Sequence, residues 1–245
     1  MIRRNYRSNL NFIETGFKAC WHNAQDLVNG AKVLLDNSLP PLALSTSVLA
    51  LEELGKLFCI DGLLFARTDS YKAEIFLKSL KSHSTKLSAV ELLPMLLGHI
   101  ASIDPRYQND LRFKQALAIS NLDLKEKGNS VLSMLKDGHF QGLDQWKQSG
   151  FYSQPRDNSF ITPGQAVKRE MAEVVYNFAW RASSTLDFLL KDGSLERYIT
   201  SARVLRAKLG EEEHQAIETY AQHILGYLFS EEGEINRKIS HQTVN

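Results

Sequence analysis

The stretch that decides the fold runs from Leu42 to Arg67 and reads LALSTSVLALEELGKLFCIDGLLFAR. Pro40 and Pro41 stand directly before it, where the first turn of a helix accepts proline, and the run is too long for a strand. Nearly all of its residues are apolar, and a helix that is apolar on almost every side belongs in the middle of a bundle. The stretch therefore predicts an all-α, multi-helix bundle built around a central apolar helix.

The central stretch also carries Glu52, Glu53 and Lys56 close together. At about 100° per residue, Ser45, Glu52 and Lys56 fall within about 40° of one another on the helix surface. One interpretation is an ordinary i, i+4 Glu-to-Lys pair, worth about 0.3–0.5 kcal/mol. The other is a functional site, because buried charges must find partners or border a water-filled cleft. The sequence leaves both interpretations open.

Helical spacing of apolar residues continues on both sides of this stretch. The further helices that it predicts span residues 11–36, 71–82, 83–103, 107–119, 122–135, 163–190, 195–209 and 211–229. Residues 136–163 are rich in Gly, Pro, Asn and Asp with scattered aromatic residues, which predicts a long loop of the kind that often carries function. Thr162 and Pro163 suit the start of the helix that follows.

Length and composition restrict the class of protein. A chain of 245 residues can bury a substantial core, and a net charge of +1 gives no strong overall field for nucleic acid, although a local patch could still bind RNA. We expect a loose N-terminus over 1–10, a single helical domain over 11–230 and a flexible tail over 231–245. Cys20 and Cys59 lie in apolar helical contexts and are expected to be reduced. We expect a cytoplasmic protein without a membrane partner, because the chain shows no secretory signal and the central stretch is charged near its middle.

Short motifs of several common enzyme classes are absent from the sequence. It has no GxxxxGK[ST], GxGxxG, HExxH or GxSxG segment. A ferritin-like di-metal bundle would need Glu-x-x-His pairs on two helices, which the sequence does not offer. We therefore expect neither a metal nor a cofactor.

Two further segments carry polar residues that could join the charges of the central helix. His83 and Lys86 lie one turn apart at the start of a predicted helix, where cations are disfavoured by the helix dipole; they indicate either an anionic partner or an ordinary surface pair. The predicted loop contributes Trp146, Lys147, Gly150, Phe151 and Tyr152. These aromatic residues could stack on bases or pack the loop onto the core, and the Tyr152 hydroxyl can reach a polar site.

Taken together, these segments resemble a known family. ALEELGK in an apolar helix, a later H-x-x-K and a K-x-x-G-F-Y segment before a proline-started helix are similar to AbiV-type abortive-infection proteins, which are bacterial antiphage proteins with a HEPN-like helical bundle. The resemblance covers roughly residues 11–190, and it implies a homodimer. Where the family's loop often carries a basic and an acidic residue around the tyrosine, this chain has Ser149 and Ser153. The site residues that the resemblance implies are Glu52, Glu53, Lys56, His83, Lys86 and Tyr152.

The resemblance also raises the hypothesis of an RNA-cleaving protein. The usual HEPN ribonuclease signature, an arginine followed after four to six residues by a histidine, is missing. Seven residues separate Arg206 from His214, and three separate Arg237 from His241. Metal-independent cleavage of RNA therefore remains a hypothesis that must be supported by other residues.

If the protein is catalytic, His83 is the natural general base for a ribose 2′-hydroxyl. Lys56 and Lys86 would stabilise the developing phosphate charge, and Glu52 or Glu53 would orient a cation. The alternative is a non-catalytic helical protein that binds a host or phage protein, with the charges forming a structural network. A cluster open to solvent would favour catalysis, whereas a sealed and fully paired one would favour the alternative.

Overall fold

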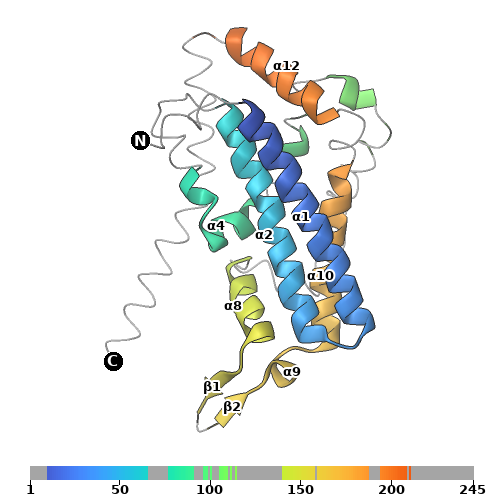
Figure 1. Ribbon diagram of the computed structural model, residues 1–245, viewed down its shortest axis with the longest axis vertical. Helices are drawn as coiled ribbons and strands as arrows, with labels where there is room; N and C mark the ends of the chain where they lie inside the picture. Colours follow the sequence, from blue (N-terminus) through green and yellow to red (C-terminus); the bar gives the residue numbers. More distant parts are fainter. Residues whose placement is uncertain are drawn as a thin grey trace, which may run out of the picture.

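A computed structural model shows an all-α bundle, as the sequence predicts. The residues that it describes are 10–65, 77–90, 96–98, 100, 105–109, 111, 114, 140–157, 159–187, 194–208 and 210. The long helices α1 (Leu10–Asp36) and α2 (Pro40–Phe65) form an antiparallel pair (Figure 1). The turn between them contains Ser38 in the left-handed region, with φ of 58°.

Helix α2 is the central helix of the fold. It begins at Pro40, as predicted, and contacts α1, α4, α8, α9, α10 and α12. Its fully buried apolar residues include Leu44, Val48, Leu51 and Leu57. Because neighbours surround it, this helix can be apolar on nearly every side.

Among the described residues, further helices pack around this pair. Helix α10 (Arg169–Thr185) packs against α1 and α2, and α12 (Ser194–Lys208) crosses their upper end in Figure 1. The Tyr198 hydroxyl on α12 donates a hydrogen bond to the buried carboxylate of Asp61 on α2. Helix α4 (His83–Val90) lies on another side of α2. A 3-10 helix, η2 (Pro105–Asn109), lies near α12, where the Tyr107 hydroxyl donates to the Ser194 carbonyl at 2.8 Å.

The predicted loop over 136–163 is wrong for most of its described residues. The chain forms helix α8 (Phe140–Phe151) and then a hairpin of β1 (Gln154–Arg156) and β2 (Ser159–Ile161), which pair in antiparallel register. Leu143, Trp146, Lys147 and Gly150 occur at i, i+3, i+4 and i+7, and all four face inwards on α8. The buried side of α8 therefore includes a lysine and a glycine, which hides its helical pattern.

The helix predicted over 163–190 starts at the expected place but is interrupted. A short helix α9 (Pro163–Ala166) follows Thr162, whose backbone N–H donates to Gln165 Oε1 at 2.9 Å. Val167 is then extended, with φ of −113° and ψ of 116°, and its side chain is buried. Burying this residue in the core redirects the chain, so that the long helix begins at Arg169.

The remaining predictions are tested only in part. The helices expected over 11–36 and 195–209 match α1 and α12, and the one expected from His83 begins there, with Ser82 Oγ accepting the N–H of Thr85 at 3.3 Å. Predicted segments that lie wholly or mainly outside the described residues are 1–10, 107–119, 122–135, 211–229 and 231–245. Of the helix predicted over 71–82, residues 77–82 are described, and 77–79 are helical.

Two observations bear on the expected class of protein. Cys20 and Cys59 are both free thiols, and burial raises the pKa of Cys59 to about 12. None of the helices in the described part of the chain has the length and hydrophobicity needed to cross a membrane.

Candidate functional site

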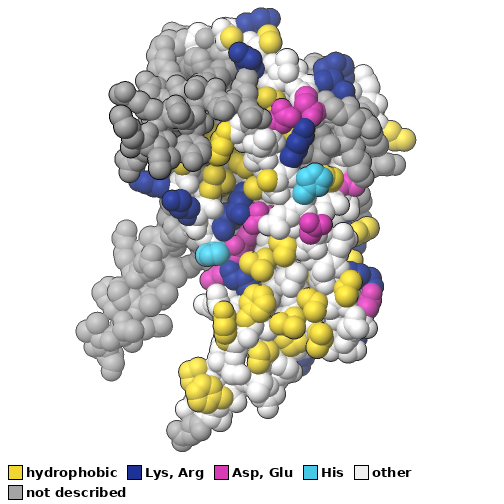
Figure 2. Space-filling model, in the orientation of Figure 1, with side chains coloured by type: hydrophobic (Ala, Val, Ile, Leu, Met, Phe, Trp, Pro, Cys, Tyr) yellow, Lys and Arg dark blue, Asp and Glu magenta, His cyan; other side chains and the backbone are white. Residues whose placement is uncertain are grey.

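Three helices bring charged side chains together on one side of α2. Glu52 comes from α2, His83 and Lys86 come from α4, and Asp144 and Lys147 come from α8. In Figure 2, acidic, basic and histidine side chains gather at the level where α4 and α8 approach α2 in Figure 1. We call these five residues the Glu52 cluster.

The position of α4 depends on a close approach to Gly55. A Cβ atom at Gly55 would lie 1.7 Å from the carbonyl oxygen of Lys86 and 2.6 Å from its carbonyl carbon. Only glycine allows two helix backbones to pack so closely at this point. The glycine of LEELGK therefore places both His83 and Lys86 beside Glu52.

The position of α8 depends on a second close approach, at Gly150. A Cβ atom there would lie 2.1 Å from Ser45 Oγ and 2.3 Å from the carbonyl oxygen of Pro41. The Ser45 hydroxyl also donates a hydrogen bond to the backbone carbonyl of Lys147 at 2.7 Å. These contacts hold α8 against α2 in the register that directs Lys147 towards Glu52.

Glu52 is the centre of the cluster and is buried. Its Oε1 lies 2.6 Å from Lys147 Nζ, and its Oε2 lies 2.6 Å from His83 Nδ1 and 3.0 Å from Lys86 Nζ. Lys86 and Lys147 are buried as well. Two ammonium groups thus compensate one buried carboxylate, which would otherwise cost several kcal/mol.

The surroundings keep both Glu52 and Lys147 charged. Burial alone would raise the pKa of Glu52, but hydrogen bonds from Lys147, Lys86 and His83 outweigh it and lower this pKa below 4.5. Burial would likewise lower the pKa of Lys147, but hydrogen bonds to Asp144 and Glu52 outweigh it and raise this pKa above 10.5. The pair is therefore ionic at neutral pH.

His83 is the most exposed member of the cluster. Its side chain is 57% exposed, although its Nδ1 contacts the buried Glu52 carboxylate. Because both oxygens of a carboxylate can only accept, His83 Nδ1 must carry the proton of this hydrogen bond. In the neutral ring, Nε2 then has a free lone pair on the side of the imidazole away from Glu52. A carboxylate orients a catalytic histidine in the same manner in hydrolase triads.

The cluster also contains three possible metal ligands. One ligand atom each from Glu52, His83 and Asp144 lies within 4.8 Å of the others. Lys147 Nζ already lies among them, 2.6 Å from an oxygen of each carboxylate and 3.3 Å from His83 Nδ1. The ammonium supplies the positive charge that these acids need, so a divalent ion would have to displace Lys147.

Comparison with known proteins adds one decisive observation. A family model described as AbiV matches residues 12–182, from α1 to near the end of α10. The chain belongs to the AbiV family. Searches of curated proteins and of solved structures gave no match. Family membership confirms the resemblance based on LEELGK and supports abortive-infection defence as the broad function of this AbiV-family protein.

The structure brings together only some of the predicted site residues of this AbiV-family chain. Glu52, His83 and Lys86 meet in the cluster. Lys56 instead pairs with Glu53 at 2.6 Å, one turn along α2, so the i, i+4 pair with Glu52 is not formed.

The Glu53–Lys56 pair faces α1 rather than α8. Burial, with a smaller contribution from the charge of Glu53, raises the pKa of the Cys20 thiol on α1 to about 11. Within the described residues, no hydrogen bond or ion pair links Glu53 or Lys56 to the Glu52 cluster.

Tyr152 lies just after α8 and is 62% exposed, with its ring at the edge of Phe151. None of the hydrogen bonds or ion pairs described for the cluster includes it. Trp146, by contrast, packs against the core, which is one of the two roles considered for the aromatic residues.

Sequence reasoning did not include Lys147 or Asp144 among the site residues of this AbiV-family chain. In the sequence, Lys147 lies in an aromatic segment predicted as a loop and is the lysine of the K-x-x-G-F-Y pattern. The helical spacing of Leu143, Trp146, Lys147 and Gly150 is the signal that could have placed the lysine on a buried face.

Proposed function

We propose that this AbiV-family protein acts in abortive infection by cleaving RNA, with His83 as the general base in a reaction that requires no metal ion. The observation that carries this proposal is the 2.6 Å contact between His83 Nδ1 and the buried Glu52 carboxylate. This contact leaves Nε2 as the base on an imidazole that is 57% exposed. An exposed histidine oriented by a buried carboxylate is suited to take a proton from a bound ligand.

The proposed reaction is an internal transfer within RNA. The ribose 2′-oxygen attacks the neighbouring phosphorus while its proton passes to His83 Nε2. The bond from phosphorus to the 5′-oxygen breaks, and the 5′-oxygen takes a proton from water. The products are a 2′,3′-cyclic phosphate and a 5′-hydroxyl end, and His83 returns its proton to the solvent. Glu52 stabilises the imidazolium that forms in between.

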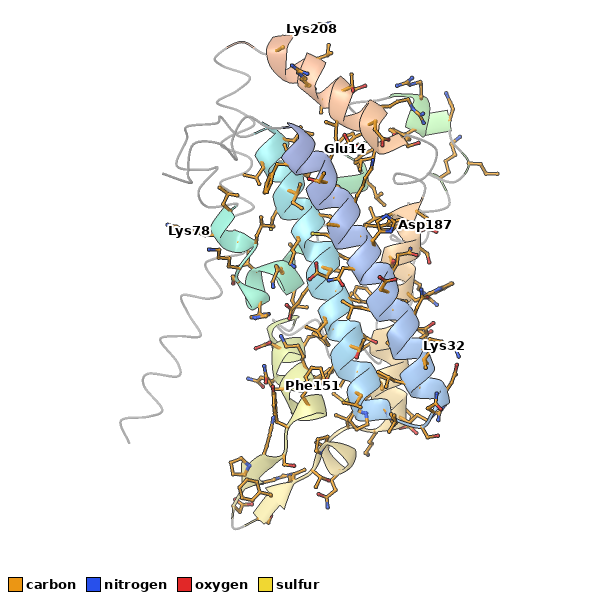
Figure 3. All side chains as sticks on the ribbon, viewed as in Figure 1. Glu14, Lys32, Lys78, Phe151, Asp187 and Lys208 are labelled. Atoms are coloured by element: carbon orange, nitrogen blue, oxygen red, sulfur yellow. The ribbon has the colours of Figure 1, made fainter. Side chains whose placement is uncertain are left out.

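Nearby lysines support an anionic substrate. Lys78 and Lys81 are exposed and directly precede α4, and Figure 3 labels Lys78 beside this helix. Exposed lysines attract the phosphates of a nucleic acid and release its counterions. Lys86 is buried, so in this scheme it acts on Glu52 rather than on the phosphate.

Cleavage of a labelled single-stranded RNA in the presence of EDTA tests this function. We expect His83→Ala to slow cleavage at least about 100-fold, which is the contribution usual for a general base. His22→Ala is the matched control, because His22 is also exposed but lies on α1 against Trp21. An otherwise identical DNA strand should remain uncut. Equal rates for the wild type and His83→Ala, or no cleavage by wild-type protein purified from phage-infected cells, would contradict the proposal.

A second candidate function is supported by the buried part of the cluster. Glu52, Lys86 and Lys147 are sealed from solvent and paired, as expected for a structural network in a protein that binds a host or phage protein. Protection of cells against phage discriminates the two. If His83→Ala protects as well as wild type while it remains folded, the interaction protein is favoured.

We also propose that the protein is a homodimer, which is the state that the family suggests. Size-exclusion chromatography with light scattering at micromolar concentration tests this, and a monomeric mass would contradict it.

A further inference from the structure

We propose that Phe151 and Tyr152 form a stacking surface for the unpaired bases of an RNA strand that reaches His83, an inference that rests on the RNA-cleaving function proposed above. It makes single-stranded RNA the substrate class of that function. Bases can stack on aromatic side chains only where their faces are free, and the bases of a duplex already stack on one another.

Helix α8 carries part of the Glu52 cluster and leads directly to both rings. Asp144 and Phe151 are seven residues apart, which is close to two helical turns, so they lie on one face of α8 and about 10 Å apart along its axis. Both side chains are partly exposed, and a carboxylate oxygen of Asp144 lies within 4.8 Å of a ring nitrogen of His83. The face of α8 that borders His83 therefore continues to Phe151.

The two rings are presented to solvent. The exposed fractions are 41% for Phe151 and 62% for Tyr152, whereas Trp146 on the same helix packs against the core. The rings meet edge to face, with centroids 6.2 Å apart and an angle of 60° between their planes. Because an edge contact covers less of the ring faces than parallel stacking does, this pair offers aromatic surface to a base.

The backbone beneath the rings is held in place. Gly150 directly precedes them, and a Cβ atom there would lie 2.3 Å from the carbonyl oxygen of Pro41 on α2. The Tyr152 N–H donates a hydrogen bond to the Gln148 carbonyl at 2.9 Å, so the helical hydrogen-bonding pattern extends to Tyr152. This segment therefore has a fixed position relative to α2, and its backbone needs little ordering when a ligand binds.

Basic side chains on both sides of the rings suit the phosphates of a strand. Lys78 and Lys81 are exposed before α4, and Arg156 is exposed on β1, beyond the rings. In Figure 2, basic side chains lie beside a histidine at the level of α4, and hydrophobic side chains lie below them over α8 and the hairpin. Figure 3 labels Lys78 beside α4 and Phe151 at the lower end of α8. Cations together with exposed aromatic rings are the combination that binds single-stranded nucleic acids.

Binding of a single-stranded RNA with methylated 2′-oxygens to the full-length protein tests the inference. This strand cannot undergo the proposed transfer, so the fluorescence anisotropy of an attached label measures binding apart from cleavage. We expect Phe151→Ala/Tyr152→Ala to weaken binding at least about 10-fold, because each stacked base contributes to affinity. Phe151→Tyr/Tyr152→Phe keeps both rings and should retain the affinity of the wild type. Trp180→Ala is the matched control, because Trp180 is also half-exposed but lies on α10.

Two further measurements separate stacking from a general defect. The rings carry no charge, so their loss should leave the slope of log affinity against log salt concentration unchanged. Lys78→Gln/Lys81→Gln should instead reduce the magnitude of this slope by about 1.4, which is about 0.7 for each lost phosphate contact. A duplex RNA of the same sequence should bind equally well to the wild type and to Phe151→Ala/Tyr152→Ala.

Equal affinity of the wild type and the folded double alanine variant for the single strand would overturn the inference. An equal loss of affinity for the duplex, or in the variant that keeps both rings, would overturn it as well. If the double alanine variant does not fold, Tyr152→Ala, which removes the more exposed ring, decides by the same comparison. Loss of phage protection with unchanged RNA binding would assign the rings to a protein partner and would also overturn the inference.

The stacking surface and the proposed function can fail separately. Binding that depends on the rings, without cleavage of unmodified RNA by the wild type, contradicts the proposed function and retains the stacking surface. Cleavage of unmodified RNA that Phe151→Ala/Tyr152→Ala leaves unchanged at subsaturating RNA concentration contradicts the stacking surface and retains the function.

Discussion

Glu52 and His83 lie 31 residues apart in the sequence, yet Glu52 Oε2 and His83 Nδ1 are 2.6 Å apart in the folded chain. Their contact joins a buried carboxylate to an exposed imidazole, which is how an ordered histidine can face solvent. Gly55 makes the contact possible because it lets the backbone of α4 pack directly on α2. The geometry of the site therefore depends on Gly55 as well as on the two side chains that meet there.

Replacement of the central carboxylate should destabilise the protein strongly. Glu52→Gln removes the counter-charge of two buried ammonium groups, Lys86 and Lys147. We expect the free energy of unfolding to fall by about 3–5 kcal/mol, the usual effect of leaving buried charge without its partner. Urea denaturation measures this directly. Glu14→Gln is the control, because Glu14 pairs with Lys18 at the surface and should contribute less than about 1 kcal/mol. Similar losses in both variants would contradict the central role of Glu52.

A single methyl group at Gly55 should separate α4 from α2. Gly55→Ala would place Cβ 1.7 Å from the Lys86 carbonyl oxygen, so the helices must move apart. We expect a loss of about 1–3 kcal/mol or more in the free energy of unfolding, together with loss of the His83 contact. Gly164→Ala provides the comparison, because no atom lies within 4 Å of a Cβ there. If thermal unfolding shows that both variants are equally stable, the result would contradict the close contact between Gly55 and the backbone of α4.

The ionic pair of Glu52 and Lys147 should limit stability at both extremes of pH. The lowered pKa of Glu52 means that its contribution is fully present above pH 4.5 and is lost as the pH falls through the lowered value. The raised pKa of Lys147 means that its contribution is fully present below pH 10.5 and is lost as the pH rises through the raised value.

The double variant Glu52→Gln/Lys147→Met isolates this effect. The difference in unfolding free energy between it and the wild type should shrink as the pH falls through the lowered pKa of Glu52 and as it rises through the raised pKa of Lys147. A difference that stays the same at both extremes of pH would show that other groups dominate.

The hydrogen bond between Tyr198 and Asp61 should stabilise the packing of α12 on the central helix α2. Both side chains are buried, and burial raises the pKa of the Tyr198 hydroxyl well above 10.0, so it remains a donor. Tyr198→Phe should cost about 1–3 kcal/mol. In a double-mutant cycle with Asp61→Asn, the two losses should not be additive. Additive losses would show that the hydrogen bond does not couple the helices.

Much of the fold could be predicted because its signals are local. Pro40, Pro41 and the continuous apolar run are enough to locate α2, and the spacing of apolar residues is enough for α1 and α12. Helix α8 was missed because its buried face includes Lys147 and Gly150. In the sequence, a lysine and a glycine are typical of a loop. In the structure, the Lys147 ammonium binds Glu52 on α2, and the absence of a Cβ atom at Gly150 allows α8 to pack closely on α2.

The residues of the candidate site could also be predicted only in part. Glu52 could be selected because a charge on an apolar helix needs a partner, whereas His83 and Lys86 were selected as cations at a helix start and from the family resemblance. The sequence could not predict that the neighbouring residues Glu52 and Glu53 belong to two different groups of ion pairs. Adjacent helical positions differ by about 100°, and only packing decides which residue each one contacts.

By itself, the sequence determined an all-α bundle around α2 and membership of the AbiV family. It also determined that the charges buried in LEELGK require partners of opposite charge. Only the tertiary structure decided that Lys147 is the partner of Glu52 and that His83 keeps one face in solvent. The physical reason is that hydrophobic periodicity is a property of a single segment. The partner of a buried charge is set by which helices can approach closely, and here Gly55 and Gly150 allow it.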